Sequence, residues 1–294
     1  MRLAKVLGAI GRTCITAGVL ILLFVAYQLW GTGIYEAREQ DRLQSEFAQE
    51  LAREKAEARR NATATTSTTV PAPPPPVGEA VGMLRIPKIG LDRAVVQGIN
   101  VPDLRKGPGH YPATPMPGQL GNAAIAGHRT TYGAPFNRLD ELAIGDPILV
   151  TTLAGTYRYK VFQSLVVHPK RGVFVLDPTP TATLTLTTCN PKFSARERLV
   201  VQARLDVDRS PKPVKAPPQA VANRSSLDDA LSGRGEPRLP TVWWGLLVIA
   251  VGAVWWLIFH RYHRWTTWFL GVVPFAIVLA VFYYHLERLL PANY

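Results

Sequence analysis

The chain contains two cysteines, and only one lies where a thiol could do chemistry. Cys14 is inside an apolar run, whereas Cys189 ends a segment of alternating residue types, so a disulfide between them is not expected. Alternate side chains of a strand point to opposite faces. One face would carry Thr183, Thr185, Thr187 and Cys189, and the other would carry Leu184, Leu186 and Thr188. We expect an accessible thiol that acts as a nucleophile; the alternative is a small buried hydrophobic residue.

A free thiol is mostly protonated at neutral pH, because its ordinary pKa is about 8.5. It therefore needs a base, and the surrounding region offers His110, His128 and His168. His128 follows the apolar stretch 122–127 and should end a strand, where side chains from several strands converge. His110 lies in a Gly- and Pro-rich stretch and His168 precedes a proline, so both are expected in loops. His128 is the candidate base.

A thiolate that attacks a carbonyl also needs a fixed donor for the oxyanion that forms. Arginine suits this role, since it stays charged and offers forked donors. Arg198 begins the apolar-alternating stretch 198–205. If this stretch pairs with 183–189, Arg198 shares the polar face of Cys189. Arg196 is a rival, but it is expected in the preceding loop.

The region that carries these residues, 81–208, consists of short runs rich in Val, Leu and Thr that Gly and Pro turns separate. Regular short strands with such punctuation predict an all-β barrel or sandwich. About 130 residues are enough for a core that folds independently.

The N-terminal region predicts a membrane anchor. Residues 13–34 carry no charge, and about 20 apolar residues span a bilayer as a helix. Three basic residues within 1–12 place the N-terminus in the cytoplasm. A cleaved signal peptide is the rival interpretation, but no small-x-small site closes the run and Trp30 sits where an interfacial anchor belongs. We expect an uncleaved anchor.

Three segments connect the predicted domains. Residues 35–60 are dense in charge and predict a solvated helix that acts as a spacer. Residues 61–80 are rich in Thr and then Pro, which favours a stiff, extended linker. Residues 209–240 are rich in Pro, Ser and charge and predict a second linker.

Two more apolar runs, 241–259 and 265–286, predict a pair of membrane spans with tryptophans near the ends of the first. The basic loop 260–264 would lie in the cytoplasm and the β domain outside, so the expected location is a multi-pass protein of the cell membrane with an extracellular catalytic domain. The alternative is one re-entrant hairpin or a buried core.

The net charge of +12 is compatible with nucleic acid, an anionic membrane or an anionic polymer. The sequence has no Lys/Arg-rich recognition helix and no zinc-finger spacing. We therefore expect a membrane partner and no nucleic acid.

Three linked motifs resemble those of sortases, the cysteine transpeptidases of Gram-positive cell envelopes, and they occur in the same order. They are the histidine segment 126–129 (AGHR) with 132–136 (YGAPF), the cysteine strand 185–189 (TLTTC) and the arginine segment 198–201 (RLVV). The resemblance covers about 81–206, and the stretch 107–112 (GPGHYP) is most similar to class E sortases. The paired C-terminal spans are outside the family core.

The resemblance implies an eight-stranded sortase-type β-barrel flanked by transmembrane helices, with a catalytic site of His128, Cys189 and Arg198. It makes Tyr111, Thr187 and Thr188 the candidate substrate-binding residues. In class E a tyrosine at the position of Tyr111 accompanies Leu-Ala-X-Thr-Gly rather than Leu-Pro-X-Thr-Gly signals. No cofactor or metal is implied.

The implied reaction is transpeptidation. Cys189 would cleave the C-terminal sorting signal of an exported protein between Thr and Gly, and a peptidoglycan-precursor amine would release the thioester. His128 would act as acid and base.

Two other classes of protein stay open. One is another cysteine enzyme, either a protease or an L,D-transpeptidase, although the latter shows Ser-X-Gly-Cys where this chain has Thr187-Thr188 before the cysteine. The other is a membrane-anchored β-domain that binds cell-wall polymer without catalysis.

Overall fold

The computed structural model describes residues 2–61, 73–216, 238–259, 265–287 and 289, which form two compact units. The described part of one unit consists of α1 (Arg2–Ala26), the π-helical turn η1 (Tyr27–Gly31), α5 (Leu239–Phe259) and α6 (Trp265–Glu287). The other unit contains α2 (Thr32–Asn61) and all of the described strands.

Eight strands close into a barrel in the order β1-β2-β3-β4-β7-β8-β6-β5. They are β1 (Ala80–Ile86), β2 (Leu91–Gln97), β3 (Gly109–His110), β4 (Asn122–Ala126), β5 (Pro147–Thr152), β6 (Gly155–Val167), β7 (Thr183–Asn190) and β8 (Glu197–Leu205). The connections hold the short helices η2 (Pro87–Ile89), α3 (Val101–Leu104), η3 (Leu139–Glu141), η4 (Val173–Leu176) and η5 (Val207–Arg209). The predicted all-β, eight-stranded barrel is confirmed.

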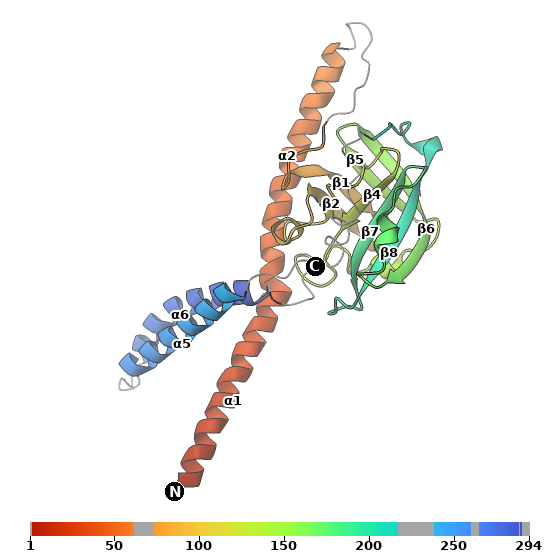
Figure 1. Ribbon diagram of the computed structural model, residues 1–294. Coiled ribbons are helices and arrows are strands. Elements are labelled where there is room, and N and C mark those ends of the chain that lie inside the picture. Colours follow the sequence, from red (N-terminus) through yellow and green to blue (C-terminus); the bar gives the residue numbers. More distant parts are fainter. Residues whose placement is uncertain (1, 62–72, 217–237, 260–264, 288, 290–294) are drawn as a thin grey trace. The chain divides into compact units, whose positions relative to one another are not determined.

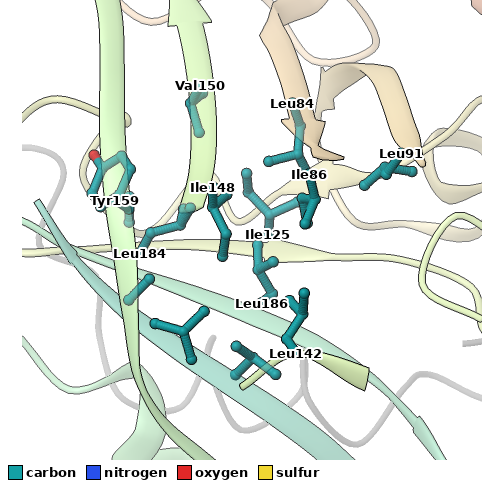
Figure 2. Packing of buried hydrophobic residues seen from close by; sticks show 14 of the residues in the cluster. Leu84, Ile86, Leu91, Ile125, Leu142, Ile148, Val150, Tyr159, Leu184 and Leu186 are labelled. Atoms are coloured by element: carbon teal, nitrogen blue, oxygen red, sulfur yellow. The ribbon is translucent and has the colours of Figure 1, made fainter. Parts of the chain in front are cut away.

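The barrel interior is filled by alternate side chains of the strands, as Figure 2 shows. Leu184 and Leu186 of β7 meet Ile125 of β4, and β1 and β5 add Leu84, Ile86, Ile148 and Val150. On β8 the inward face is Leu199, Val201, Ala203 and Leu205. This is the predicted alternation, so the residues between these apolar ones must face outward, Cys189 and Arg198 among them.

One strand pair decides where the candidate site lies. β4 runs parallel to β7, with Ala126 opposite Thr187, while β8 runs antiparallel to β7 on its other side. The carboxyl ends of β4 and β7 therefore meet at one edge of the barrel, together with the amino end of β8.

Helix α2 packs on the barrel beside β1 and β2 (Figure 1) and is not the solvated spacer that its composition predicts. A stripe at helical spacing is buried: Thr32, Glu36, Gln40, Leu43 and Phe47. Leu43 lies against Ala94 and Val96 of β2. The prediction failed because three of the five buried residues are polar, which hides the stripe from a hydrophobic pattern. Thr32 lies within the predicted anchor 13–34, but it already belongs to the barrel unit.

In the other unit, α1, α5 and α6 pack together. Val248, Leu279 and Tyr283 are buried, and Leu20 and Phe24 of α1 pack against them. The hydroxyl of Tyr283 donates a 2.6 Å hydrogen bond to the carbonyl of Leu20. By length and composition, the helices over Val6–Arg60 and Leu239–Ile258 could cross a membrane, and Gly271–Glu287 is a shorter apolar helix.

Most of the predicted linkers 61–80 and 209–240 and the whole of the predicted loop 260–264 fall outside the described residues, which omit 62–72, 217–237 and 260–264. Their predicted roles stay predictions.

Candidate active site

The segment after β4 is tied to the end of β7 by two hydrogen bonds. The backbone N–H of Gly127 donates to the carbonyl of Thr187 at 3.0 Å, and the hydroxyl of Thr188 donates to the carbonyl of Gly127 at 2.7 Å. His128 follows Gly127, and Cys189 follows Thr188. The candidate base and the candidate nucleophile therefore belong to neighbouring strand ends at the same level of the barrel.

Arg198 lies directly opposite Cys189 in the register of β7 and β8, which confirms the predicted pairing. Cross-strand partners on one face have their β-carbons about 5 Å apart, within reach of a long side chain. Arg198 is 6% exposed, and its Nη1 donates to the carbonyls of Ala195 and Glu197 at 3.1 Å each. The rival Arg196 is exposed in the loop before β8, as predicted.

Cys189 is 4% exposed, so the expectation of an accessible thiol is wrong. Its face of the barrel is polar, as predicted, but it is covered rather than open. A second cluster packs there, with Val173, Val175 and Leu176 of η4 beside Tyr111. Leu184 and Leu186 of β7 lie on the opposite, inward face. Cys189 is therefore as buried as a core residue, but it is not part of the barrel core.

His128 is also buried, and neither ring nitrogen has a hydrogen-bond partner among the residues that the structure describes. Burial, followed by the nearby charge of Arg105, lowers the pKa of His128 to about 4. The imidazole is therefore neutral at pH 7 and can accept a proton. Its ring centroid lies 5.3 Å from that of Tyr132, with the two planes 32° apart.

The comparisons with known proteins identify the family. Residues 84–206 match the Sortase domain family. Sortase SrtE1 of Streptomyces coelicolor is 34% identical over 216 residues, which are 68% of this chain and 57% of that protein. Sortase SrtE2 of the same organism is 29% identical over 229 residues, which are 71% of this chain and 87% of that protein. This chain belongs to the sortase family.

The two relatives are E sortases, in agreement with the predicted resemblance to class E. A crystal structure of sortase E1 from Streptomyces coelicolor with a tripeptide in the active site is 34% identical, has a TM-score of 0.41, and is matched over 44% of this chain and 88% of that one. The chain spans only a little over half of sortase SrtE1, 57% of its length.

This sortase has a further arginine at the site that sequence reasoning did not select. Arg129 is 5% exposed, and its Nη1 donates to the carbonyl of Cys189 at 3.1 Å and to Oδ1 of Asn190 at 2.7 Å. Its Nη2 lies 3.2 Å from a carboxylate oxygen of Asp140. The available signal was its position next to His128 in the AGHR motif. Arg129 fastens the histidine segment to the cysteine strand.

Of the predicted substrate-binding residues, Tyr111 and Thr187 lie together on the outer face. The Tyr111 hydroxyl is 3.1 Å from Oγ1 of Thr187, and burial raises the pKa of the phenol. Thr187 shares the outer face of β7 with Cys189, two residues further along the strand, so Tyr111 lies on the same face as the thiol. Thr188 faces the other way and its hydroxyl is used by Gly127, so its substrate role stays a prediction that the geometry does not favour.

His110 and His168, the other two histidines of the barrel region, both lie away from the candidate site. His168 is exposed, in the loop after β6 as predicted. His110 is in strand β3 and is buried, so its expected loop position is wrong. Its ring nitrogens lie 2.8 Å from Oε1 of Gln97 and 2.9 Å from the carbonyl of Pro115. These contacts hold His110 in place, and His110 thereby helps to position the next residue, Tyr111.

Within the described part of the chain, no three His, Cys, Asp or Glu side chains gather as metal ligands would.

Proposed function

We propose that this sortase is a membrane-anchored cysteine transpeptidase that uses Cys189, His128 and Arg198. The observation that carries the proposal is the register of β7, which sets Arg198 opposite Cys189 and brings the segment of His128 to the same strand end. Sortases in general act on proteins with sorting signals and on cell-wall precursors.

In the first half-reaction, neutral His128 takes the thiol proton as Cys189 attacks the carbonyl carbon of the Thr–Gly bond. Arg198 donates to the oxygen as negative charge develops there. The C–N bond then breaks, His128 returns the proton to the leaving glycine amine, and the substrate remains on Cys189 as a thioester.

In the second half-reaction the amine of a peptidoglycan precursor attacks the thioester. His128 takes the proton of the incoming amine, the C–S bond breaks, and the thiol is regenerated. The substrate class is an exported protein with a Leu-Ala-X-Thr-Gly or Leu-Pro-X-Thr-Gly signal.

The location proposed is the cell membrane, with the barrel on the outer surface. The apolar helices α1 and α5 supply the anchor, and the basic residues within 1–12 and 260–264 favour a cytoplasmic position for both segments. Protease digestion of intact protoplasts tests this: the barrel should be cleaved while an N-terminal tag is protected. Protection of the barrel would contradict the orientation.

The reaction is tested with the full chain in detergent, carrying Cys14→Ala so that Cys189 is the single thiol. It is incubated with both signal peptides, with and without an amine, and analysed by mass spectrometry. We expect a thioester on Cys189 and an amine-dependent ligated product, both absent in Cys189→Ala. Hydrolysis that no amine redirects would instead indicate a cysteine protease, and unchanged product in Cys189→Ala would exclude this thiol.

A further inference from the structure

The turn after His128 has an unusual backbone. Three consecutive residues are left-handed: Tyr132 has φ 48°, Gly133 has φ 70° and Ala134 has φ 45°. Glycine adopts this region readily, but residues with a β-carbon do so at a cost in conformational free energy. Such a turn persists only where surrounding contacts hold it.

The first turns of α2 contact Tyr132 and Gly133. Oγ1 of Thr32 accepts a 3.2 Å hydrogen bond from the backbone N–H of Tyr132. The carboxylate of Glu36 fills the space next to Gly133, where any added β-carbon would collide with it. The ring of Tyr35 meets the ring of Tyr132 edge-on, with centroids 6.4 Å apart. Helix α2 therefore touches both the backbone and a side chain of the turn.

The same turn touches the candidate base. The Tyr132 ring packs on the His128 imidazole at 5.3 Å between centroids, and the Arg105 guanidinium lies 5.4 Å from the centre of the Tyr132 ring. Because neither imidazole nitrogen has a hydrogen-bond partner in the described structure, ring packing is what orients His128. A shift of the Tyr132 backbone would move the aromatic surface against which the imidazole rests.

The docking of α2 is itself firmly defined. Glu36 is 2% exposed and pairs with Nε of Arg93 at 3.0 Å. The Gln40 amide accepts from the Ala94 N–H at 2.8 Å and donates to the carbonyls of Ala94 and Lys106 at 3.1 and 2.8 Å. These polar bonds fix the rotation and height of the helix, which apolar contacts alone would leave less precise. They set the position of Thr32.

We propose that the first turn of α2 is part of the catalytic apparatus, in which Thr32 holds the Tyr132 turn and thereby positions the His128 imidazole. This inference rests on the proposed function of His128. Thr32 is a positioning residue, since it acts through Tyr132. It follows that the barrel 81–208, which we predicted as the catalytic domain, is incomplete without α2.

The test uses the full chain in detergent with signal peptide and amine. Thr32→Val keeps the shape and removes the acceptor, Thr32→Ser keeps the hydroxyl, and Thr16→Val is the matched control. Thr16 is an exposed threonine of α1 whose hydroxyl donates to the carbonyl of Arg12, one turn earlier in the same helix, at 3.0 Å. We expect Thr32→Val to lower kcat about 5- to 10-fold, the effect of one hydrogen bond, with KM within about twofold. Thr32→Ser and Thr16→Val should retain kcat.

A second pair of variants tests the route through Tyr132. Tyr132→Leu removes the ring that packs on His128, and adding Thr32→Val to it should cause no further loss of kcat, because coupled residues are not additive. Equal losses from Thr32→Val in both backgrounds would overturn the proposed route. Wild-type kcat in Thr32→Val, or a rise in KM alone, would overturn the proposal itself.

A readout independent of catalysis separates this inference from the proposed function. NMR of the full chain with labelled histidine, the His128 signal being assigned from His128→Gln, should show that signal displaced in Thr32→Val and unmoved in Thr16→Val. An unmoved signal in Thr32→Val overturns the inference even if the chain is an active transpeptidase. A wild-type chain that forms no thioester or ligated product overturns the proposed function, whatever the NMR shows.

Discussion

The guanidinium of Arg129 donates a 3.1 Å hydrogen bond to the backbone carbonyl of Cys189, so the residue after the candidate base is fastened to the candidate nucleophile. The same nitrogen, Nη1, donates to Oδ1 of Asn190 at 2.7 Å, and Nη2 lies 3.2 Å from a carboxylate oxygen of Asp140. These contacts join the two segments together with the hydrogen bonds that Gly127 forms with Thr187 and Thr188. Arg129 is therefore a determinant of the spacing between His128 and Cys189.

We predict that Arg129→Lys lowers kcat/KM about 10- to 100-fold. A lysine has no planar fork to serve these partners together, and hydrogen bonds from charged groups are worth about 1.5–3 kcal/mol. Steady-state ligation kinetics measure the effect. Arg138→Lys is the matched control, because Arg138 forms an exposed pair with Glu141 and should change little. Wild-type kinetics in Arg129→Lys would show that the backbone alone sets the spacing.

Stability should fall as the pH is lowered from about 6.5 to about 4. Burial lowers the pKa of both His110 and His128 to about 4 in the folded chain, whereas an unfolded histidine titrates near 6.5. In this window the unfolded state binds protons that the folded state does not, so each step down in pH favours unfolding. Above pH 6.5 the contribution is fully present. Each histidine can contribute up to a few kcal/mol.

Urea unfolding at several pH values between 4 and 7 measures this slope. His110→Gln should flatten it, because glutamine keeps polar atoms for Gln97 and the carbonyl of Pro115 and does not titrate. Paired carboxylates such as Asp146 and Asp206 have a lowered pKa and also lose their contribution in acid, but they are the same in the variant. An identical slope in wild type and His110→Gln would contradict the prediction.

The sequence predicted the faces of the strands but not what covers them. Alternation along 183–189 and 198–205 correctly separated the inward leucines from Cys189 and Arg198, because side-chain direction is a local property of a strand. The cover over this outer face comes from other parts of the chain: Tyr111 contacts Thr187 on it, and Val173, Val175 and Leu176 of η4 pack with Tyr111. No local pattern contains that contact, so the thiol was expected to be accessible.

The docked face of helix α2 is a second feature that local sequence patterns do not reveal. Its buried stripe begins with Thr32, Glu36 and Gln40, which a solvated helix would also contain. What makes them interior residues is the set of partners on β2 and on the turn after His128, and these partners are remote in sequence. The charged composition correctly predicts a helix, whereas the docked face depends on partners that a local pattern does not contain.

Tyr111 should influence the choice between alanine and proline at the second position of the signal. Tyr111→Phe keeps the ring and deletes the hydroxyl that lies 3.1 Å from Thr187. We expect the ratio of kcat/KM for Leu-Ala-X-Thr-Gly and Leu-Pro-X-Thr-Gly peptides to change about 3- to 10-fold, the range of one hydrogen bond. Thr187→Val removes the other partner and should move the ratio in the same direction. A ratio that neither variant changes would remove Tyr111 from the specificity pocket.

The choice between the two arginines before and in β8 is decided by one comparison. Arg198 faces Cys189 across β7 and β8 and is buried, whereas Arg196 is exposed in the loop. Loss of one preorganised oxyanion donor typically costs about 10²- to 10³-fold in kcat. We therefore expect Arg198→Ala to lower kcat at least about 100-fold and Arg196→Ala to retain wild-type kcat.

Arg198 also donates hydrogen bonds to the carbonyls of Ala195 and Glu197, so its loss could displace the loop before β8. Thermal unfolding of Arg198→Lys, measured beside its kinetics, distinguishes a displaced loop from the loss of the oxyanion donor. Full activity in Arg198→Ala with loss in Arg196→Ala would assign the oxyanion to the loop arginine, and the register of β7 and β8 would no longer account for the chemistry.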